Sequence, residues 1–193
     1  MTSIFFIRHA EPDHDWEDDR TRPLTDEGIA DSRKIIEFFR NHKIDCYMSS
    51  PYKRSIDTIK EIAFEHSIDI IMDERFRERE KGLNGSSLEM LQKRWDNFDF
   101  HEENGESLNM VQSRNIEAVL EILNNRKGEK IVIGTHGTAL STILNYFDPS
   151  YCCNDFLRII DFMPYIIRLD FDGINYVGKE ELLIIQKVFK GRK

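Results

Sequence analysis

The sequence predicts an α/β fold, a three-layer sandwich in which helices cover both faces of a mostly parallel central sheet. Short apolar runs typical of buried strands alternate with longer amphipathic stretches typical of helices. No internal repeat and no linker rich in proline, glycine or serine interrupts the alternation, which favours parallel strands joined by crossover helices. Because 193 residues suit one sizeable core, we expect a single domain over residues 1–193 with a small lid insertion around 79–105.

Six segments have the composition of strands. The first, Ser3–Arg8, is an almost continuous apolar run, which is typical of a buried strand. Asp172-Gly173 lies between the last two segments and is a hairpin turn signal. The expected strands are Ser3–Arg8, Asp45–Ser49, Ile68–Met72, Lys130–Gly134, Pro164–Phe171 and Ile174–Val177.

Five segments have the features of helices. The first begins at Thr25, a good N-cap, and has acidic residues in its first turn and an apolar stripe from Ile29 to Phe39. Ser50-Pro51 is a natural N-cap and first helical position for the second. The expected helices are Thr25–Asn41, Ser50–His66, Ser87–Asn97, Ser107–Asn125 and Gly137–Phe147.

Charge and cysteine content exclude several classes of protein. The net charge of -8 argues against broad binding of nucleic acids or anionic membranes, which both need a basic surface. Three cysteines, Cys46, Cys152 and Cys153, form neither a disulfide framework nor a metal-binding spacing. No window approaches the roughly 18 apolar residues of a membrane span, and no signal-peptide core follows the N-terminus. We therefore expect a cytoplasmic protein.

Residues suited to phosphate chemistry stand where three of the expected strands end. Arg8 and His9 end the first strand, Arg54 falls in the first helical turn after the second, and His136-Gly137 follows the fourth. Ligands of such sheets bind beyond the carboxyl ends of the strands, so we expect these residues to gather at one edge. Arginine binds two phosphate oxygens at once, neutral imidazole is a nucleophile near pH 7, and helix N-termini add N–H donors. Each residue alone has an ordinary structural interpretation, and their joint placement favours phosphoryl chemistry.

Six motifs, in their order along the chain, resemble those of the histidine phosphatase superfamily, also called phosphoglycerate mutase-like. Arg8-His9-Ala10-Glu11 resembles the family's Arg-His-Gly-Glu opening, with alanine in place of glycine. The resemblance covers roughly residues 3 to 140, and the last fifty residues contain no family motif. The other motifs are Arg20–Gly28, Ser49-Ser50-Pro51 with Arg54 and Thr58, Phe76-Arg77-Glu78 with Gly82 and Gly85, Gly105-Glu106-Ser107 with Arg114, and Thr135-His136-Gly137.

The resemblance implies a role for each matched residue. It implies that His9 accepts the phosphoryl group as a phosphohistidine. It implies that Arg8, Arg54 and His136 hold the phosphate oxygens, and that Glu78 protonates the leaving oxygen and later activates water. It implies no metal ion and no other cofactor.

The assignment of the general acid rests on spacing, because the surrounding segment is rich in charge. Glu74 and Glu80 are rivals of Glu78, and a charged loop of this kind is often only a solvated surface. The family pattern places a glycine four positions after the acid, and Gly82 stands at that offset from Glu78. This offset selects Glu78.

Other residues near the motifs have alternatives that stay open. Gly137 opens a helix whose first N–H groups suit a phosphate, so we count it as substrate-binding. Glu106 and Ser107 stand at a helix start, where they either cap the helix or contact substrate. Arg114 lies mid-helix, where a structural role is expected. Asp15 stands where many family members carry a phosphate-binding asparagine, and because a carboxylate would repel the substrate we leave it out of the phosphate set.

Two further groups of residues have a functional and a structural interpretation. The acidic loop offers carboxylates and one histidine to a divalent ion, although such loops are usually only solvated. Three aromatic residues either line a pocket or belong to the core, and core is the commoner role. The loop residues are Glu11, Asp13, His14, Asp15, Glu17, Asp18 and Asp19, and the aromatic residues are Trp95, Phe98 and Phe100.

The expected activity is that of a metal-independent, histidine acid phosphatase-type phosphohydrolase acting on small phosphorylated metabolites. Family mutases typically carry a long insertion after the general acid, whereas only 27 positions separate Glu78 from Gly105, which favours hydrolysis. The alternatives are phosphoglycerate mutase-type transfer, a phosphatase of phosphohistidine on proteins, and a non-catalytic module that binds phosphorylated ligands. The oligomeric state, monomer or homodimer, stays open.

Overall fold

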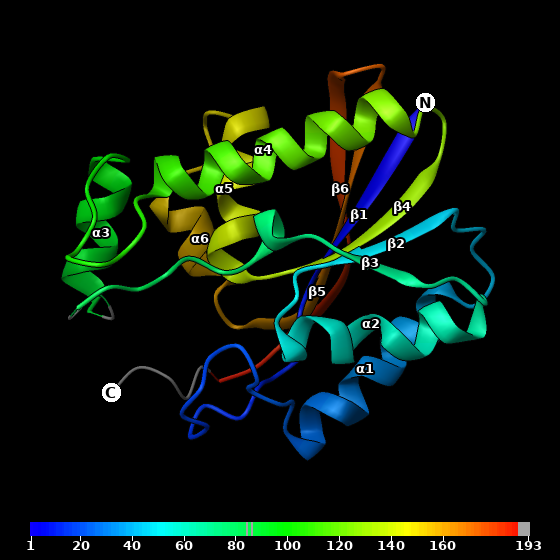
Figure 1. Ribbon diagram of the computed structural model, residues 1–193, viewed down its shortest axis with the longest axis horizontal. Coiled ribbons are helices and arrows are strands. Elements are labelled where there is room, and N and C mark those ends of the chain that lie inside the picture. Colours follow the sequence, from blue (N-terminus) through cyan, green and yellow to red (C-terminus); the bar gives the residue numbers. More distant parts are fainter. Residues whose placement is uncertain (84, 86, 189–193) are drawn as a thin grey trace.

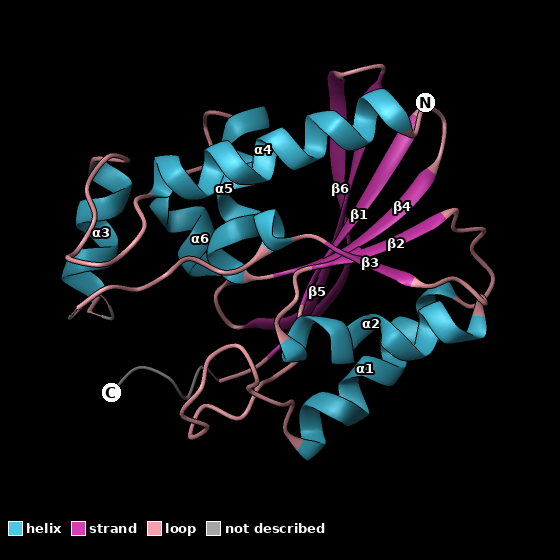
Figure 2. Cartoon of the chain, in the orientation of Figure 1, coloured by secondary structure: helices cyan, strands magenta, loops and turns pink. Residues whose placement is uncertain are grey.

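The computed structural model describes residues 1–83, 85 and 87–188, and it places a six-stranded sheet between layers of helices (Figures 1 and 2). The α/β fold expected from the sequence is confirmed. The strands are β1 (Thr2–Arg8), β2 (Cys46–Ser49), β3 (Ile70–Met72), β4 (Lys130–Thr135), β5 (Phe162–Asp172) and β6 (Asn175–Gln186). The helices are α1 (Asp26–Phe39), α2 (Lys53–Glu65), α3 (Leu88–Asp96), α4 (Leu108–Asn125), α5 (Gly137–Phe147) and α6 (Cys153–Ile159), with a 3-10 turn, η1 (Glu74–Phe76).

The order of the strands determines where the functional side chains lie. The sheet runs β3-β2-β4-β1-β5-β6, with parallel pairing from β3 to β1 and antiparallel pairing from β1 to β6. Arg8 of β1 lies opposite Thr135 of β4, and Ser49 of β2 lies opposite Gly134. The carboxyl ends of these three neighbouring strands therefore meet at one edge of the sheet.

Two apolar clusters hold the layers together, one on each face of the sheet. Side chains alternate between the faces along β1, as the two-residue period of a strand requires. Ile4 and Phe6 pack with residues of α4, α5 and α6, whereas Phe5 and Ile7 pack with residues of α1 and α2. Figure 2 shows these two groups of helices on opposite sides of the sheet.

Side chains cap several helices as the sequence predicts. The Thr25 hydroxyl accepts a hydrogen bond from the Gly28 N–H at 2.9 Å and caps α1. Ser87 and Ser107 cap α3 and α4 in the same way. The N-cap expected at Ser50 is wrong, because α2 begins at Lys53 and the Ser50 hydroxyl is bound instead to His136.

The C-terminal part of the chain differs most from the expectation. Helix α6, with only seven residues, was not expected, and β6 continues to Gln186 instead of ending at Val177. Strand β6 is an edge strand with many exposed positions, so its charged residues fit there without interrupting it. Among the described residues, no helix is both long enough and apolar enough to cross a membrane.

The segment 79–105 projects beside the carboxyl ends of the strands and contains α3 (Figure 1). Lys81 and Gly105 pair as an isolated antiparallel bridge at its base. Trp95 packs on Phe98, Tyr151 and Phe156, which confirms a core role for this aromatic residue. Residues 84 and 86 lie outside the described part, and the interpretation of the segment as a lid stays a prediction.

Candidate active site

Three neighbouring strand ends bring residues distant in sequence together. His9 directly follows β1, Ser50 follows β2, and His136 follows β4. The rings of His9 and His136 lie 5.2 Å apart, and the Arg54 side chain reaches His9 from the first turn of α2. All of these side chains are buried, with at most 6% of their surface exposed. The gathering expected at this edge of the sheet is present.

Hydrogen bonds on both sides of its ring determine the state of His9. Nδ1 lies 2.8 Å from the backbone carbonyl of Ala10, which can only accept, so Nδ1 carries the proton. Nε2 then holds a lone pair, and it accepts a hydrogen bond from Nε of Arg54 at 3.2 Å. Burial and the charges of Arg54 and Arg8 hold the pKa of His9 well below its usual value of 6.5. His9 is thus a neutral imidazole whose Nε2 can attack an electrophile near pH 7.

Two buried guanidinium groups flank this imidazole. Arg8 donates to the backbone carbonyls of Ile159 at 2.5 Å and Phe162 at 3.2 Å. Its Nε is buried and has no hydrogen-bond partner among the described residues. Burial lowers the pKa of Arg8 to about 10, so the group stays charged at neutral pH. Since an unpartnered buried donor is costly, Arg8 is prepared to bind an anionic oxygen.

His136 is fully buried between His9 and the start of α2. Its Nε2 lies 2.7 Å from the hydroxyl of Ser50, and its Nδ1 is buried without a hydrogen-bond partner in the described part of the chain. Burial, followed by the charge of Arg54, holds the pKa of His136 well below 6.5. A neutral His136 still has one ring nitrogen to donate and one to accept.

The carboxylate of Glu78 is bound at the N-terminus of α5. The N–H groups of Thr138 and Ala139 each donate to it at 3.2 Å, and the N–H of Arg79 donates at 2.8 Å. The positive end of the helix dipole stabilises a carboxylate at this position. The sequence predicts that N–H groups of this helix face a phosphate, but those of Thr138 and Ala139 are used to hold Glu78. Helix α5 thus orients the expected general acid.

The start of α5 also limits the space around Arg8. A Cβ atom added to Gly137 would lie 3.3 Å from Nε of Arg8 and 3.4 Å from its Cζ. The contact with Nε is tighter than most real Cβ contacts, so a larger residue would make the guanidinium shift slightly. Gly137 lines the same cavity as Arg8 and leaves room for its side chain.

The site includes a cavity of about 410 Å³, whose lining does not include the fully buried His136. Arg8, His9, Arg54 and Glu78 line one part of it, together with Gly137. The volume is in the range of small-molecule sites, which are usually between 300 and about 1,000 Å³. The arrangement can hold a tetrahedral anion on arginines, attack it with an imidazole nitrogen and supply a proton from a carboxyl group.

Glu106 and Ser107, for which helix capping and substrate contact both stayed open, lie outside this cavity lining. The Glu106 carboxylate accepts from Arg77 at 2.7 Å and twice from Arg114 at 3.0 Å, and these bonds lower its pKa further than burial raises it. The Ser107 hydroxyl accepts from the N–H of Met110 and caps α4. The Glu106 side chain thus connects α4 to the segment that carries Glu78. The structural role expected of Arg114 agrees with these contacts.

The loop after β1 contributes one acidic residue that the sequence did not single out. Asp19 lines the cavity, its Oδ1 lies 3.3 Å from Arg54, and its backbone carbonyl accepts from the same guanidinium at 2.5 Å. Asp15 stands at the position where many family members carry a phosphate-binding asparagine. It is exposed and lies outside the cavity lining. Asp19 has no distinctive spacing among the seven ionisable residues of the loop, so the sequence contains no signal for it.

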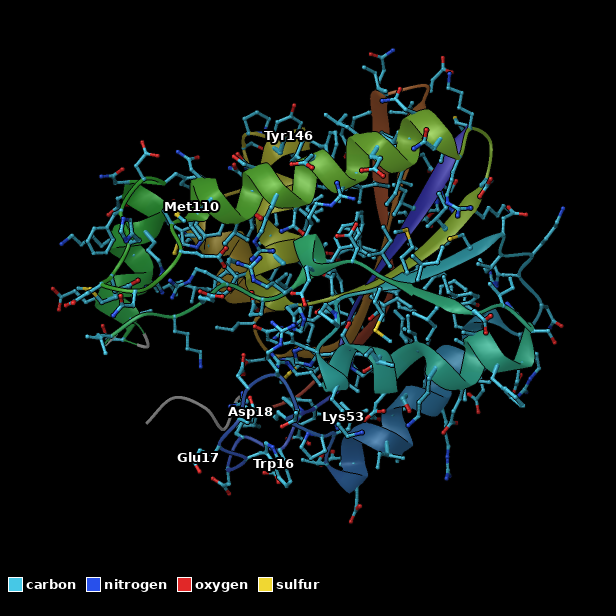
Figure 3. All side chains as sticks on the ribbon, in the orientation of Figure 1. Trp16, Glu17, Asp18, Lys53, Met110 and Tyr146 are labelled. Atoms are coloured by element: carbon cyan, nitrogen blue, oxygen red, sulfur yellow. The ribbon has the colours of Figure 1, made fainter. Side chains whose placement is uncertain are left out.

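The tip of this loop points away from the molecule. Figure 3 shows Trp16, Glu17 and Asp18 at its outer end, with Lys53 nearby at the start of α2. Among the described residues, no group of three or more histidine, cysteine, aspartate or glutamate side chains converges as a metal-binding cluster would. The metal-site interpretation of the loop gains no support from this arrangement.

Comparison with known proteins identifies the family. The chain is 26% identical to "Uncharacterized phosphatase PhoE" of Bacillus subtilis (strain 168), over 75% of this chain and 76% of the relative. It is also 26% identical to "Probable phosphoglycerate mutase GpmB" of Enterobacter sp. (strain 638), over 75% of this chain and 74% of the relative.

Solved structures share the fold at low identity. Phosphoserine phosphatase of Entamoeba histolytica, in complex with 3-phosphoglyceric acid, superposes with a TM-score of 0.77 at 18% identity over all of both chains. A mycobacterial glucosyl-3-phosphoglycerate phosphatase superposes with a TM-score of 0.74 at 14% identity, over 96% of this chain and 97% of that one. Residues 4–156 match the family model of the histidine phosphatase superfamily (branch 1), and this match shows that the chain belongs to that superfamily.

Proposed function

We propose that this chain is a metal-independent phosphohydrolase that removes phosphate from small phosphorylated metabolites through a phosphohistidine on His9. The observation that carries the proposal is the state of His9. Its Nδ1 is bound to the Ala10 carbonyl, and its Nε2 carries a lone pair beside Arg54 in a cavity that Glu78 also lines. Relatives and structural neighbours include proteins named as phosphatases, which supports hydrolysis.

The first chemical step forms a bond between His9 and phosphorus. Nε2 of His9 attacks the phosphorus atom while the bond from phosphorus to the ester oxygen breaks. The leaving oxygen takes a proton from the carboxyl group of Glu78, which must therefore be protonated when the ester binds. Arg8 and Arg54 stabilise the negative charge on the phosphoryl oxygens throughout. His136, whose Nδ1 has no partner in the described residues, donates to another of these oxygens.

The second step returns the enzyme to its starting state. Glu78, now a carboxylate, takes a proton from a water molecule as that water attacks the phosphorus. The P–N bond breaks, its electron pair returns to Nε2 of His9, and inorganic phosphate leaves. The hydrogen bonds from Thr138 and Ala139 keep Glu78 in place for both proton transfers.

Within this proposal, Arg8, Arg54, His136 and Gly137 form the phosphate site, whereas Glu106 and Ser107 have structural roles. The residues from 79 to 105 act as a lid of one short helix, α3. A cavity of about 410 Å³ suits a small ester and release of phosphate to water. A cytoplasmic location and either a monomer or a homodimer stay predictions from the sequence, as does the absence of nucleic-acid and membrane partners.

The proposal is tested by trapping the phosphoenzyme. The wild-type protein is mixed with a ³²P-labelled phosphate ester and quenched, and we expect a protein-bound label that is labile to acid and stable to base. His9→Ala removes the attacking nitrogen, so it should show no label and lose turnover of p-nitrophenyl phosphate by at least about a thousandfold. His101→Ala, at an exposed position outside the cavity lining, is the matched control.

The outcomes separate the remaining alternatives. Phosphate binding without turnover in the wild-type protein would indicate a non-catalytic module. Rearranged ester in place of inorganic phosphate would indicate mutase-type transfer, the activity in the name of the Enterobacter relative. Loss of activity in EDTA would contradict the metal-independent mechanism.

A further inference from the structure

The cavity that contains His9 also has an apolar wall, which phosphate chemistry does not use. Leu88 and Leu91 of α3 line it, together with Leu157 and Ile160 at the end of α6. Leu91, Leu157 and Ile160 are half-buried, and Leu88 is 63% exposed. Covering apolar surface of this kind with another apolar group is favourable, because the water in contact with it is released. The wall is therefore suited to the part of a substrate that is not phosphate.

The packing of α3 explains why this wall stays open. Leu88, Leu91 and Trp95 follow helical spacing and share one face of α3. Trp95 closes on α6, with its ring 6.0 Å from that of Phe156 and 6.1 Å from that of Tyr151. One to two turns earlier, Leu88 and Leu91 line the cavity instead. Helices α3 and α6 thus contact each other through Trp95. Nearer to the start of α3 they form the two sides of an apolar cleft.

Buried ion pairs hold this wall in position. The carboxylate of Glu102 binds Arg94 of α3 and also Arg79, which directly follows Glu78, with the Arg79 pair at 3.1 Å. Arg94 donates further to the Gly85 carbonyl at 3.2 Å. The side chains of this ion-pair cluster, Arg79, Arg94 and Glu102, are at most 6% exposed. The cluster fixes α3 beside the general acid, so the apolar cleft is present before substrate binds.

Charged residues also line this part of the cavity. The carboxylate of Glu102 lies between Arg79 and Arg94 and already pairs with both of them. A carboxylate or second phosphate on the substrate would compete with Glu102 for these two guanidinium groups, and would find Arg22 and Lys81 as further cations in the lining. The apolar wall binds an uncharged group without such competition, so it is the wall, and not the charge of the lining, that favours an apolar alcohol part.

From these observations we propose that the enzyme selects phosphate monoesters whose alcohol part is apolar, such as medium-length alkyl or arylalkyl phosphates. The alcohol part lies between Leu88 and Leu91 on one side and Leu157 and Ile160 on the other. This selectivity rests on the proposed function, because the ester bond that positions the alcohol part is the one that His9 breaks. Each methylene group that becomes buried should raise kcat/KM by about threefold to fourfold.

A homologous series of primary alkyl monophosphates, from ethyl to hexyl, tests the proposal. The leaving alcohols have nearly the same acidity, so differences in kcat/KM report binding of the chain and not the ease of bond breaking. We expect kcat/KM of the wild-type enzyme to rise by about eightyfold or more across the series, since four methylene groups are added at threefold to fourfold each. A flat series would overturn the proposal.

Matched variants locate the effect. Leu91→Ser removes part of the wall and should flatten the rise with chain length. Leu120→Ser changes another half-buried leucine that packs on the same core cluster but lies outside the cavity lining, and it should keep the wild-type slope. Leu157→Asn is the second wall variant, with circular dichroism to verify folding. A slope unchanged in both wall variants would contradict binding between α3 and α6.

Failure of this proposal differs from failure of the proposed function. Turnover of every ester at a similar rate, with labelled His9, would refute apolar selection alone. No turnover of any ester and no trapped label would refute both.

Discussion

In the proposed mechanism, Asp19 competes with the substrate for one of the two arginines beside His9. Its carboxylate lies 3.3 Å from Arg54, inside the cavity that we propose accepts a phosphate dianion. The charge of Asp19 favours the charged form of Arg54 and opposes the desolvation that lowers the pKa of this group. When a phosphate enters, it gives Arg54 a second anionic partner and is repelled by the first.

Replacing this carboxylate should improve phosphate binding. Asp19→Asn keeps the shape and the backbone contact but removes the negative charge, so we expect KM and the inhibition constant for inorganic phosphate to fall about threefold to fivefold. The change in both constants should be this small because a partly exposed ion pair is only modestly strong. Asp15→Asn, in the same loop but outside the lining, should leave both constants unchanged. Weaker phosphate binding in Asp19→Asn would show that Asp19 positions Arg54 instead of competing for it.

At the scale of elements, a buried carboxylate ties α3 to the segment that precedes it. The Glu102 side chain is 5% exposed and binds both Arg94 and Arg79, and it thereby joins α3 to the segment that carries Glu78. Removing one member of a buried ion pair leaves the other charges without compensation. The attachment of the predicted lid therefore depends on Glu102 more than on the exposed acids nearby.

Glu102→Gln should destabilise the fold by about 3 kcal/mol, as breaking a buried ion pair usually does. The neighbouring Glu103 is exposed, so Glu103→Gln should change the free energy of unfolding by less than about 0.5 kcal/mol. Urea unfolding followed by circular dichroism measures both values. Equal stabilities of the two variants would contradict the role of Glu102 in holding α3.

The elements also show what the sequence can predict. Strands β1, β2 and β4 are apolar runs, and the sequence predicted that the residues at their ends meet at one edge of the sheet, because parallel order follows from the alternation with helices. Helix α6 was missed because its seven residues span too few turns for a clear apolar period. The apolar wall was missed because leucines on a helix face have the same pattern whether they meet a core or a cavity.

At the scale of the whole molecule, two buried histidines link stability to pH. Burial and nearby arginines hold the pKa values of His9 and His136 well below 6.5 in the folded protein. In the unfolded chain both groups regain ordinary pKa values, so they take up protons as the pH falls below about 6.5 while the folded state does not. The contribution of the two neutral histidines to the free energy of unfolding is therefore fully present above about pH 6.5, and it is lost as the pH falls below that value.

The free energy of unfolding should therefore decrease between pH 7 and pH 5, by up to about 2 kcal/mol for each histidine that stays neutral. The range from pH 7 to pH 5 lies above the pH at which protonation of paired carboxylates, such as Asp57 and Asp73, begins to reduce stability, because their pKa values are lowered in the folded protein. Thermal unfolding at the two pH values measures the change. His9→Gln should reduce it, whereas His101→Gln, at an exposed position, should not. A melting temperature that is the same at both pH values in the wild-type protein would contradict this linkage.

The central place of β1 has a consequence for biosynthesis. Both of its neighbours come from the second half of the chain, since residues 3–8 pair with residues 130–135 of β4 and with residues 165–170 of β5. Strand β1 leaves the ribosome before either of its neighbours, and more than 120 further residues must be made before it is enclosed. Closing such long loops is entropically costly and slows folding. His9 consequently gains its full surroundings late, and a nascent chain that ends before β4 cannot yet present the assembled site.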